Sequence, residues 1–421
     1  MEGTVENEYW VGVDWGESSH AVTIVDGRRR IRKSFTVPHS IAGMEALCAS
    51  LAGLQPVRGI AVESTRNLII AHLLAAGYVL YPINPKMSAA WRKGDSVAGC
   101  KSDERDGKVL ARELAVRWEQ LAPMWPEGDE VRELALLCEH EQRLIEDRTR
   151  HILRLQSALK LYFPAALEFF SDWKSPTAWE WLKVFPTAEK FAKASNERLY
   201  QFLRTHSIGI SPQWRARVEA HADAAKWTVS TATSTAYSMR AISEVCQLIT
   251  ITEQLKIYRK RIEALFAQRE DHVIFDSLPG AGKKLAPRLF AIFGTDRRRY
   301  VTPDPLRLLS GVAPVMKQSG KKCHVTIRRA CKKPWRNTMH QFALCSKKYC
   351  SWAKAFYDHR RAQGDGDAQA LRKLADKWLK IVHRMWRERV PYNETKYVES
   401  LYKRKSPLLA YLPVDNPVEN S

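Results

Sequence analysis

Hydrophobic patterns typical of strands and of helices alternate along residues 8–120. Short β-branched runs bounded by turn residues predict strands, and apolar residues spaced three and four apart predict helices. The predicted strands are 9–14, 21–25, 32–37, 59–63 and 78–83, and the predicted helices are 41–51, 68–75 and one from about 102. Residues 84–101 are marked by Pro, Gly and Ser and are predicted to be a loop. The first three strands predict an antiparallel meander within a layered α/β domain.

The middle of the chain has helical periodicity instead. Apolar positions recur at helical spacing from about 134 to 162 and again from about 241 to 266. They predict two long amphipathic helices that form an antiparallel pair or a coiled-coil arm. Residues 163–235, rich in Trp, Phe and Pro, predict short helices between them. An ordinary helical bundle is the alternative, and dimerisation through this region fits either arrangement.

The last segment begins at 278–282 and continues through a basic loop into a helical tail that ends near 403. The tail interleaves aromatic side chains with Arg and Lys. Such interleaving suits stacking on the bases of single-stranded or structured nucleic acid. Burial in the helical core is an equally good interpretation. The aromatic residues concerned are Trp335, Trp352, Tyr357, Trp378 and Trp386.

Composition narrows the class of protein. A chain of 421 residues with 45% hydrophobic and 27% charged residues predicts two or three globular domains. No apolar run approaches the roughly 20 residues that span a bilayer, and the polar, acidic first residues do not resemble a secretory signal. The eight cysteines form no CxxC pair and fit no standard zinc spacing. We therefore expect a cytoplasmic protein that does not associate with a membrane.

The charge is concentrated at one end of the chain. Residues 271–421 hold 31 Lys and Arg against 13 Asp and Glu, whereas residues 1–270 hold 36 against 33. Localised positive charge is typical of proteins that bind polyanions, because binding releases counterions from the nucleic acid. A surface built only for solubility would mix the two signs. The C-terminal third is therefore predicted to bind nucleic acid.

Four carboxylates stand out by position. Asp14 and Glu63 end predicted strands, where α/β sheets bind ligands. Asp103 and Asp106 are three apart, so they share one helical face. Taken singly, each also fits a turn or cap residue. Carboxylates can converge only around cations, and oxygen ligands favour Mg²⁺ or Mn²⁺. Two such ions are the usual arrangement for phosphodiester displacement.

Ser319 precedes a glycine among basic residues. Positive charge favours the alkoxide form of a serine and the transition state of attack on a phosphate. A turn serine is the alternative, since Ser-Gly pairs are common in loops. Ser310 also precedes a glycine and is the competing candidate. The cations predicted to bind nucleic acid are Lys317, Lys321, Lys322, Arg328, Arg329, Lys332, Lys333 and Arg336.

Several motifs together resemble one family. Residues 11–20 (VGVDWGESSH), 62–65 (VEST) and 101–106 (KSDERD) are similar to the DEDD motif of the insertion sequence 110 family of transposases, also called bridge-RNA-guided recombinases. Residues 278–282 (LPGAG), 309–314 (LSGVAP) and 317–320 (KQSG) resemble that family's second domain. Gly107 stands where the family usually has alanine, and residues 323–336 lack its glycine pattern.

The resemblance implies a fold and a domain order. It implies an α/β RuvC-like (RNase H-type) N-terminal domain, an all-α helical or coiled-coil middle and a mostly α C-terminal transposase domain. The corresponding ranges are 1–125, 126–272 and 273–405, with 406–421 as a tail.

It also implies a chemistry: Asp14, Glu63, Asp103 and Asp106 would hold Mg²⁺ or Mn²⁺, and Ser319 would form a phosphoserine link to DNA. The implied partners are element-end and target DNA, a structured guide RNA and further copies of the chain, as a dimer or tetramer, in a bacterial or archaeal cytoplasm. The alternatives are a hydrolytic RuvC-like nuclease or junction resolvase, a DNA invertase, and a non-catalytic, domesticated nucleic-acid-binding protein.

Overall fold

The computed structural model describes residues 8–54, 56–63, 68–95, 103–124, 127–227, 229–319 and 322–412. The chain divides into two compact units, residues 1–126 and 127–421. Each unit has its own hydrophobic clusters. They are described separately below.

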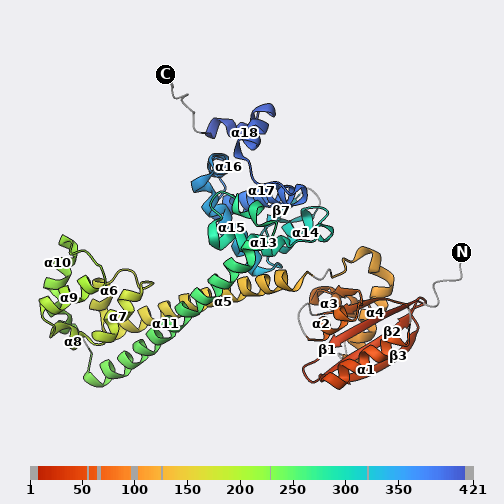
Figure 1. Cartoon of the computed structure of the whole chain (residues 1–421), viewed down its shortest axis with the longest axis horizontal. Helices are drawn as coiled ribbons and strands as arrows, with labels where there is room; N and C mark the ends of the chain where they lie inside the picture. Colours follow the sequence, from red (N-terminus) through yellow and green to blue (C-terminus); the bar gives the residue numbers. More distant parts are fainter. Residues whose placement is uncertain are drawn as a thin grey trace. The chain divides into compact units, whose positions relative to one another are not determined.

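The N-terminal unit is built on a mixed five-stranded sheet (Figure 1). Its strands are β1 (Tyr9–Trp15), β2 (Ser19–Asp26), β3 (Ile31–Pro38), β4 (Val57–Val62) and β5 (Leu80–Pro82), in the spatial order β3-β2-β1-β4-β5. The β1–β2 and β2–β3 pairs are antiparallel, and β1–β4 and β4–β5 are parallel. The predicted antiparallel meander of the first three strands is confirmed.

Helices cover both faces of this sheet. They are α1 (Ile41–Ala52), α2 (Leu68–Ala75), α3 (Pro85–Asp95), α4 (Asp103–Arg117) and a 3-10 turn η1 (Trp118–Gln120). Alternate strand residues point to opposite faces. Val11 and Val13 accordingly pack with side chains of α1 and α2, whereas Trp10 packs with α4.

The prediction of a loop over 84–101 is wrong for its first part, since Pro85–Asp95 forms α3. Proline is common in loops, but at the first helical position its missing N–H costs nothing and its φ suits a helix. The Asn84 side chain also accepts a hydrogen bond from the Lys86 backbone N–H at 2.9 Å. The segment therefore begins a helix where the sequence pattern indicated a loop.

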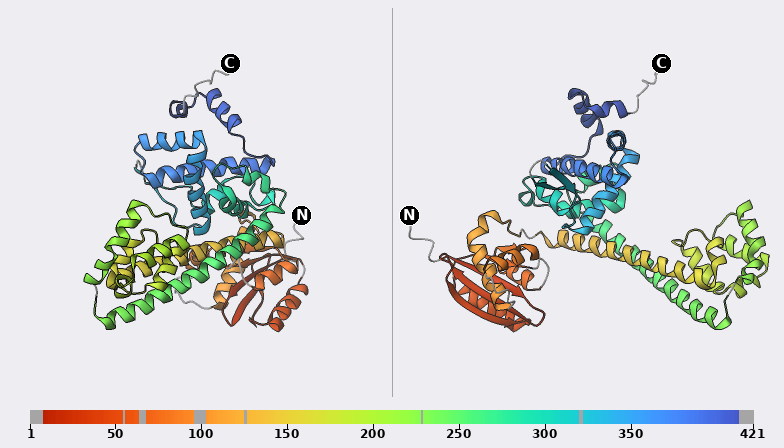
Figure 2. Two further views of the ribbon diagram at one scale, coloured as in Figure 1. Left: turned by 60° about the vertical axis from the view of Figure 1, so that its left-hand side comes forward. Right: turned by 180° about the vertical axis from the view of Figure 1, so that it is seen from behind.

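The C-terminal unit contains two long antiparallel helices, α5 (Asp129–Tyr162) and α11 (Thr231–Ala267), which lie side by side (Figure 2). Ion pairs set their register, including Arg261 with Glu133 and Arg259 with Glu141, both at 2.8 Å. The second helix begins ten residues before its predicted start at 241, because the Ser230 hydroxyl caps it by accepting from the Thr233 N–H.

Short helices join the far ends of α5 and α11 (Figure 2). They are α6 (Pro164–Phe169), α7 (Pro176–Val184), α8 (Ala188–Ala192), α9 (Asn196–Thr205), α10 (Pro212–Glu219) and η2 (Ala220–Lys226). Their core is aromatic: the Trp181 ring lies 5.0 Å from the Phe169 ring and 4.8 Å from the Phe191 ring, measured between centroids. The predicted short helices over 163–235 are thus confirmed, and they form a lobe with its own core.

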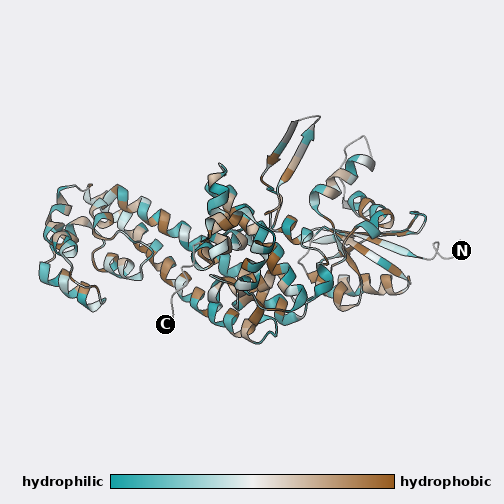
Figure 3. Cartoon of the chain, turned by 90° about the horizontal axis from the view of Figure 1, so that it is seen from above, coloured by the Kyte–Doolittle hydropathy of each residue, from teal (hydrophilic) through white to brown (hydrophobic). Residues whose placement is uncertain are grey.

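The rest of the unit is helical except for one hairpin. Its elements are α12 (His272–Asp276), α13 (Gly282–Phe293), η3 (Arg297–Arg299), α14 (Asp304–Leu309), β6 (Val315–Ser319), β7 (Lys322–Thr326), α15 (Lys333–Tyr349), α16 (Ser351–Ala362), α17 (Asp367–Glu388), α18 (Glu394–Lys403) and η4 (Pro407–Tyr411). The hairpin replaces part of the predicted basic loop and projects from the helices (Figure 3).

The aromatic residues of the tail are largely core. Trp352, Trp378 and Trp386 are fully buried, so base stacking is the wrong interpretation for these three. Trp335 and Tyr357 are half-buried at the edge of the same core. The indole N–H of Trp378 donates to the Ser346 hydroxyl at 2.8 Å, which satisfies the polar atom of a buried ring.

Candidate functional site

Two glycines bring β1 and α4 into contact. A Cβ on Gly12 would lie 2.2 Å from the backbone oxygen of Gly107 and 2.5 Å from the backbone nitrogen of Ala111. No side chain fits at that distance, so Gly12 is required for α4 to pack directly on the strand. A Cβ on Gly107 would lie 3.3 Å from both Ala21 O and Thr23 Oγ1, which the larger alanine would crowd. This close approach places the first turns of α4 beside the end of β1.

The register of the sheet places Asp14 and Glu63 side by side. β1 and β4 are parallel with Val13 opposite Val62, and each acid follows directly. Trp10 and Ala61, an even number of residues away from the acids, belong to the cluster that packs on α4. Both acids are therefore assigned to the face that α4 covers, and both are half-buried.

Arg92 forms ion pairs with both Asp106 and Glu63. Asp106 lies in the first turn of α4 and is 3% exposed. The Nη1 atom of Arg92, on α3, donates to Asp106 Oδ2 at 2.7 Å and lies 3.5 Å from Glu63 Oε1. One guanidinium is thus shared by two carboxylates. Arg92 was not among the predicted site residues, because its segment was predicted to be a loop rather than a helix facing α4.

The remaining oxygens of this cluster allow a test of metal binding. Asp106 Oδ1 and Glu63 Oε1 are buried and have no hydrogen-bond partner among the described residues. Buried oxygens without donors fit a hard cation such as Mg²⁺ or Mn²⁺, which takes oxygen ligands. Within the described part of the chain, no three acidic, His or Cys residues are gathered closely enough to hold a metal. The Asp103 side chain lies outside that part.

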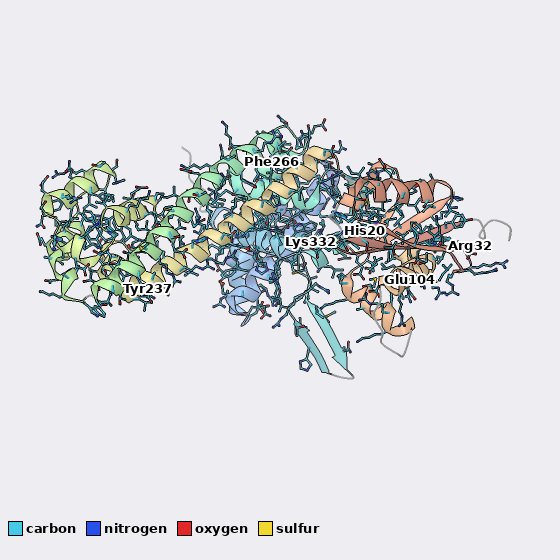
Figure 4. The ribbon with its side chains drawn as sticks, turned by 90° about the horizontal axis from the view of Figure 1, so that it is seen from below. His20, Arg32, Glu104, Tyr237, Phe266 and Lys332 are labelled. Atoms are coloured by element: carbon cyan, nitrogen blue, oxygen red, sulfur yellow. The ribbon has the colours of Figure 1, made fainter. Side chains whose placement is uncertain are left out.

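A histidine pair, buried His20 and exposed His39, lies on the other face of the sheet from this cluster. His20 pairs with Trp15, which is an odd number of residues from Asp14. Its Nε2 is 3.0 Å from His39 Nδ1, and burial, followed by the charge of His39, lowers the pKa of His20. His20 and Arg32 are labelled in Figure 4. The pair therefore belongs to the packing of the sheet and not to the carboxylate cluster.

The hairpin carries the predicted nucleophile. Ser319 is the last residue of β6 and pairs with Lys322 across the turn, while residues 320 and 321 lie outside the described part. The side chains of Lys317, Ser319 and Lys322 are likewise not described. The structure thus places the backbone of Ser319 at the end of a projecting hairpin (Figure 3).

Basic residues follow the hairpin at its base. Arg329, Lys332 and Lys333 are exposed, and Arg328 and Arg336 are half-buried. Lys332, labelled in Figure 4, holds its Nζ 4.2 Å from the centroid of the Trp335 ring. These cations are therefore close together in the chain, and three of them are accessible to a polyanion.

The competing serine has a structural role. Ser310 is fully buried, and its hydroxyl donates to the Leu306 carbonyl at 2.6 Å. The next residue, Gly311, has a φ of 66°, and a Cβ there would lie 2.7 Å from Cys331 Sγ. This turn holds the chain that returns from the hairpin, where the Lys332 N–H donates to the Leu309 carbonyl at 2.8 Å. Ser310 therefore ends α14 inside the core.

No helix in the described part of the chain combines the length and apolar character needed to cross a membrane.

Comparison with known proteins defines the class as transposases. A DEDD transposase model matches residues 11–164, and a model of the IS116/IS110/IS902 transposase family matches residues 272–358. The chain belongs to the IS110 family of transposases.

Relatives align with most of the chain. The mini-circle putative transposase for IS117 of Streptomyces coelicolor is 27% identical over 398 residues, which cover 91% of this chain and 95% of the relative. The 44.8 kDa protein of insertion element IS116 of Streptomyces clavuligerus is 27% identical over 404 residues, covering 92% and 96%. The 42 kDa protein of insertion element IS900 of Mycobacterium paratuberculosis is 25% identical over 395 residues, covering 91% and 97%.

Proposed function

We propose that this chain is an insertion-sequence transposase that cuts and rejoins DNA in a reaction dependent on Mg²⁺ or Mn²⁺. The observation that carries the proposal is the meeting of Glu63 and Asp106 at one arginine, on the sheet face assigned to Asp14. A mixed sheet that presents acids at the carboxyl ends of parallel strands suits the RuvC-like fold expected of this unit. Membership of a DEDD transposase family supports the same assignment.

In this proposal Asp14, Glu63, Asp103 and Asp106 hold the metal. A divalent ion there would polarise the scissile phosphate and stabilise the leaving oxygen. The chain's own contribution is to fix the carboxylates: the Gly12 contact positions α4, and Arg92 offsets the charge of Asp106 and Glu63. Because the guanidinium pairs with both carboxylates, a metal held by Asp106 and Glu63 would compete with Arg92.

Ser319 is proposed as the nucleophile. Its Oγ attacks the phosphorus and loses its proton, the P–Oγ bond forms, and the bond to the leaving deoxyribose oxygen breaks as that oxygen gains a proton. The phosphoserine link keeps the energy of the phosphodiester, so rejoining needs no ATP. Support comes from Arg328, Arg329 and Lys332, which follow the hairpin at its base and suit a polyanion, and from Ser310, whose hydroxyl is committed to the core.

The partners proposed are element-end and target DNA, a structured guide RNA and further copies of the chain. The net charge of +18 over residues 271–421 supports a polyanionic partner. The antiparallel pair of α5 and α11 is proposed as the arm through which protomers associate. In such an oligomer, the acids of one protomer can act with the serine of another.

A hydrolytic nuclease is the second candidate, favoured by one observation. Glu63, Arg92 and Asp106 form their cluster entirely within the N-terminal unit. Water activated at that cluster would cut DNA without any serine.

A trapping assay separates the two functions. The full chain is incubated with its flanking RNA, labelled element-end DNA and Mg²⁺, and denaturing gels reveal any protein–DNA adduct. We expect an adduct from the wild type and from Ser310→Ala, the matched serine control, and none from Ser319→Ala. DNA cleavage without an adduct that is unchanged in Ser319→Ala would overturn the serine mechanism and support hydrolysis.

A further inference from the structure

A second basic site lies in the C-terminal unit. A cavity of about 1140 Å³ opens between α14, α16, α17, α18 and the chain after α18. We call it the α17 cleft, because seven of its lining residues are on that helix: Gln369, Arg372, Lys373, Asp376, Lys377, Lys380 and Ile381. Their spacing of three and four places them on one helical face. The volume exceeds the roughly 300–1,000 Å³ of small-molecule pockets, which favours a polymer segment.

Some of the cleft's cations are already paired. Arg307 Nε lies 2.6 Å from an oxygen of Asp376, the acidic residue in the wall. Arg360 and Lys373 share Asp365, at 2.6 and 2.8 Å. These pairs hold the walls together and leave little negative charge for the other cations.

Three cations of the cleft remain unmatched. Within the described part of the chain, no carboxylate pairs with Arg372, Lys377 or Arg404. Arg372 and Lys377 are half-buried and Arg404 is exposed. Like charges repel one another, and the two half-buried cations are costly to keep desolvated without counter-ions. An anion entering the cleft would therefore be bound favourably.

Aromatic rings hold one of these cations in place. Lys377 is half-buried, and its Nζ lies 4.8 Å from the Phe356 ring centroid and 5.8 Å from the centroids of Tyr397 and Trp352. Burial lowers the pKa of Lys377, and the charges of Lys380 and Arg404 lower it further. The rings offer π faces to the ammonium but no formal negative charge.

The cleft also offers surfaces suited to nucleotides. Phe356 and Tyr397 are half-buried at its wall, and aromatic faces beside cations are the usual combination for binding nucleic-acid strands. His359, another lining residue, has a buried Nδ1 with no hydrogen-bond partner among the described residues. Helices α16 and α17, which form two of the walls, lie side by side (Figure 1).

We propose that the α17 cleft binds the phosphate backbone of a nucleic-acid strand through Arg372, Lys377 and Arg404. The cavity reaches the base of the hairpin at Val325 and Ile327, but its basic side chains come from α14, α16, α17 and the residue after α18. The proposal deepens the proposed transposase function by adding a strand-holding site that takes no part in cleavage. DNA and RNA share the chemistry that it recognises.

The test measures binding without cleavage. Fluorescence anisotropy in EDTA measures the binding of the full chain to labelled oligonucleotides of one sequence. The oligonucleotides are single-stranded DNA, duplex DNA and RNA, and each is titrated at a series of salt concentrations. The variant R372Q/R404Q is compared with K396Q/K403Q, which removes the same charge from exposed positions on α18 outside the lining. Lys377→Met, which keeps the apolar stem, is a third variant, and thermal melting checks that each is folded.

We expect R372Q/R404Q to weaken binding and to lower the slope of log Kd against log salt by about two, since each lost phosphate contact lowers it by about 0.9. Lys377→Met should lower it by about one, and the control should match the wild type. The oligonucleotide that shows the change identifies DNA or RNA as the occupant. Slopes equal to the control for all three oligonucleotides would overturn the proposal. The anisotropy is measured in EDTA without cleavage, so this result is independent of the trapping assay.

Discussion

The carboxylate cluster and the α17 cleft have excess charge of opposite sign. In the first, Glu63 and Asp106 share the single guanidinium of Arg92. In the second, Arg372, Lys377 and Arg404 lack acidic partners in the described part of the chain. The overall charges differ in the same sense, since residues 1–126 hold 15 basic and 14 acidic residues whereas residues 271–421 hold 31 and 13. One region is suited to a cation and the other to a polyanion.

The sharpest way to break this comparison is to remove one carboxylate. Asp106→Asn should lower DNA cleavage by at least about 100-fold, because even outer-shell partners of metal sites are worth 10–100-fold. Oligonucleotide binding in EDTA should stay unchanged. The matched control, Glu113→Gln, removes an acid from the exposed side of the same helix, where it pairs with Arg117. Cleavage by Asp106→Asn at the control rate would contradict the role assigned to the cluster.

A second test concerns a buried arginine of the C-terminal unit that we expect to stabilise the fold, in contrast to the cations of the α17 cleft. Arg288 is buried and donates to Glu141 Oε2 at 2.8 Å and to Gln142 Oε1 at 2.9 Å, which ties α13 to α5. Arg288→Met should lower the free energy of unfolding by about 3–5 kcal/mol, because it leaves a buried acid without this partner.

The control for that measurement is Arg143→Met, since Arg143 forms an exposed pair with Glu139. That change should cost about 0–1 kcal/mol in urea unfolding. Equal losses for the two variants would show that the Arg288 network is not the link between α13 and α5.

Arg92 offers a test of the acidic region by stability alone. Arg92→Leu should lower the free energy of unfolding by about 1–3 kcal/mol in EDTA, because Asp106 stays buried without its guanidinium. Mg²⁺ should raise the melting temperature of this variant more than that of the wild type, since the competing cation is gone. Arg117→Leu, which breaks an exposed pair with Glu113, is the control. An equal response to Mg²⁺ in all three proteins would contradict metal binding at these oxygens.

The smallest expected effect concerns acid sensitivity away from the site. Burial raises the pKa of Asp26, but the Arg30 N–H, the Arg32 charge and the Arg28 N–H lower it, and the net pKa lies below its ordinary value. The folded pKa is depressed, so Asp26 adds stability above the unfolded value near 4, and this stability is lost as the pH falls towards the folded pKa. Asp26→Asn should flatten that loss in thermal melts below about pH 4. If the melting temperature of Asp26→Asn fell with pH as steeply as that of the wild type, this contribution of Asp26 would be contradicted.

Much of the N-terminal fold follows from local pattern. Short β-branched apolar runs in β1 and β2 and helical spacing in α1 and α2 were enough to predict those elements. The pattern missed α3, because Pro85 starts a helix instead of ending one, and Arg92 was missed with it. That arginine is recognisable only when α3 and α4 are packed together.

The C-terminal unit was less predictable for a different reason. Residues 315–326 are polar and basic, and pair as a hairpin through backbone bonds that leave little trace in the sequence. Aromatic residues such as Trp378 have similar sequence surroundings whether they fill a core or stack on bases. The side-chain roles of Asp103 and Ser319 stay predictions from sequence and family.

We propose that acids of the N-terminal unit and the hairpin serine serve one reaction. The most direct measurement is the yield of denaturant-resistant protein–DNA adduct, in Mg²⁺, from Asp106→Asn, from Ser319→Ala and from an equimolar mixture of the two. We predict no adduct from either variant alone and recovery in the mixture, where protomers supply each other's missing group. A wild-type yield of adduct from either variant alone would contradict it.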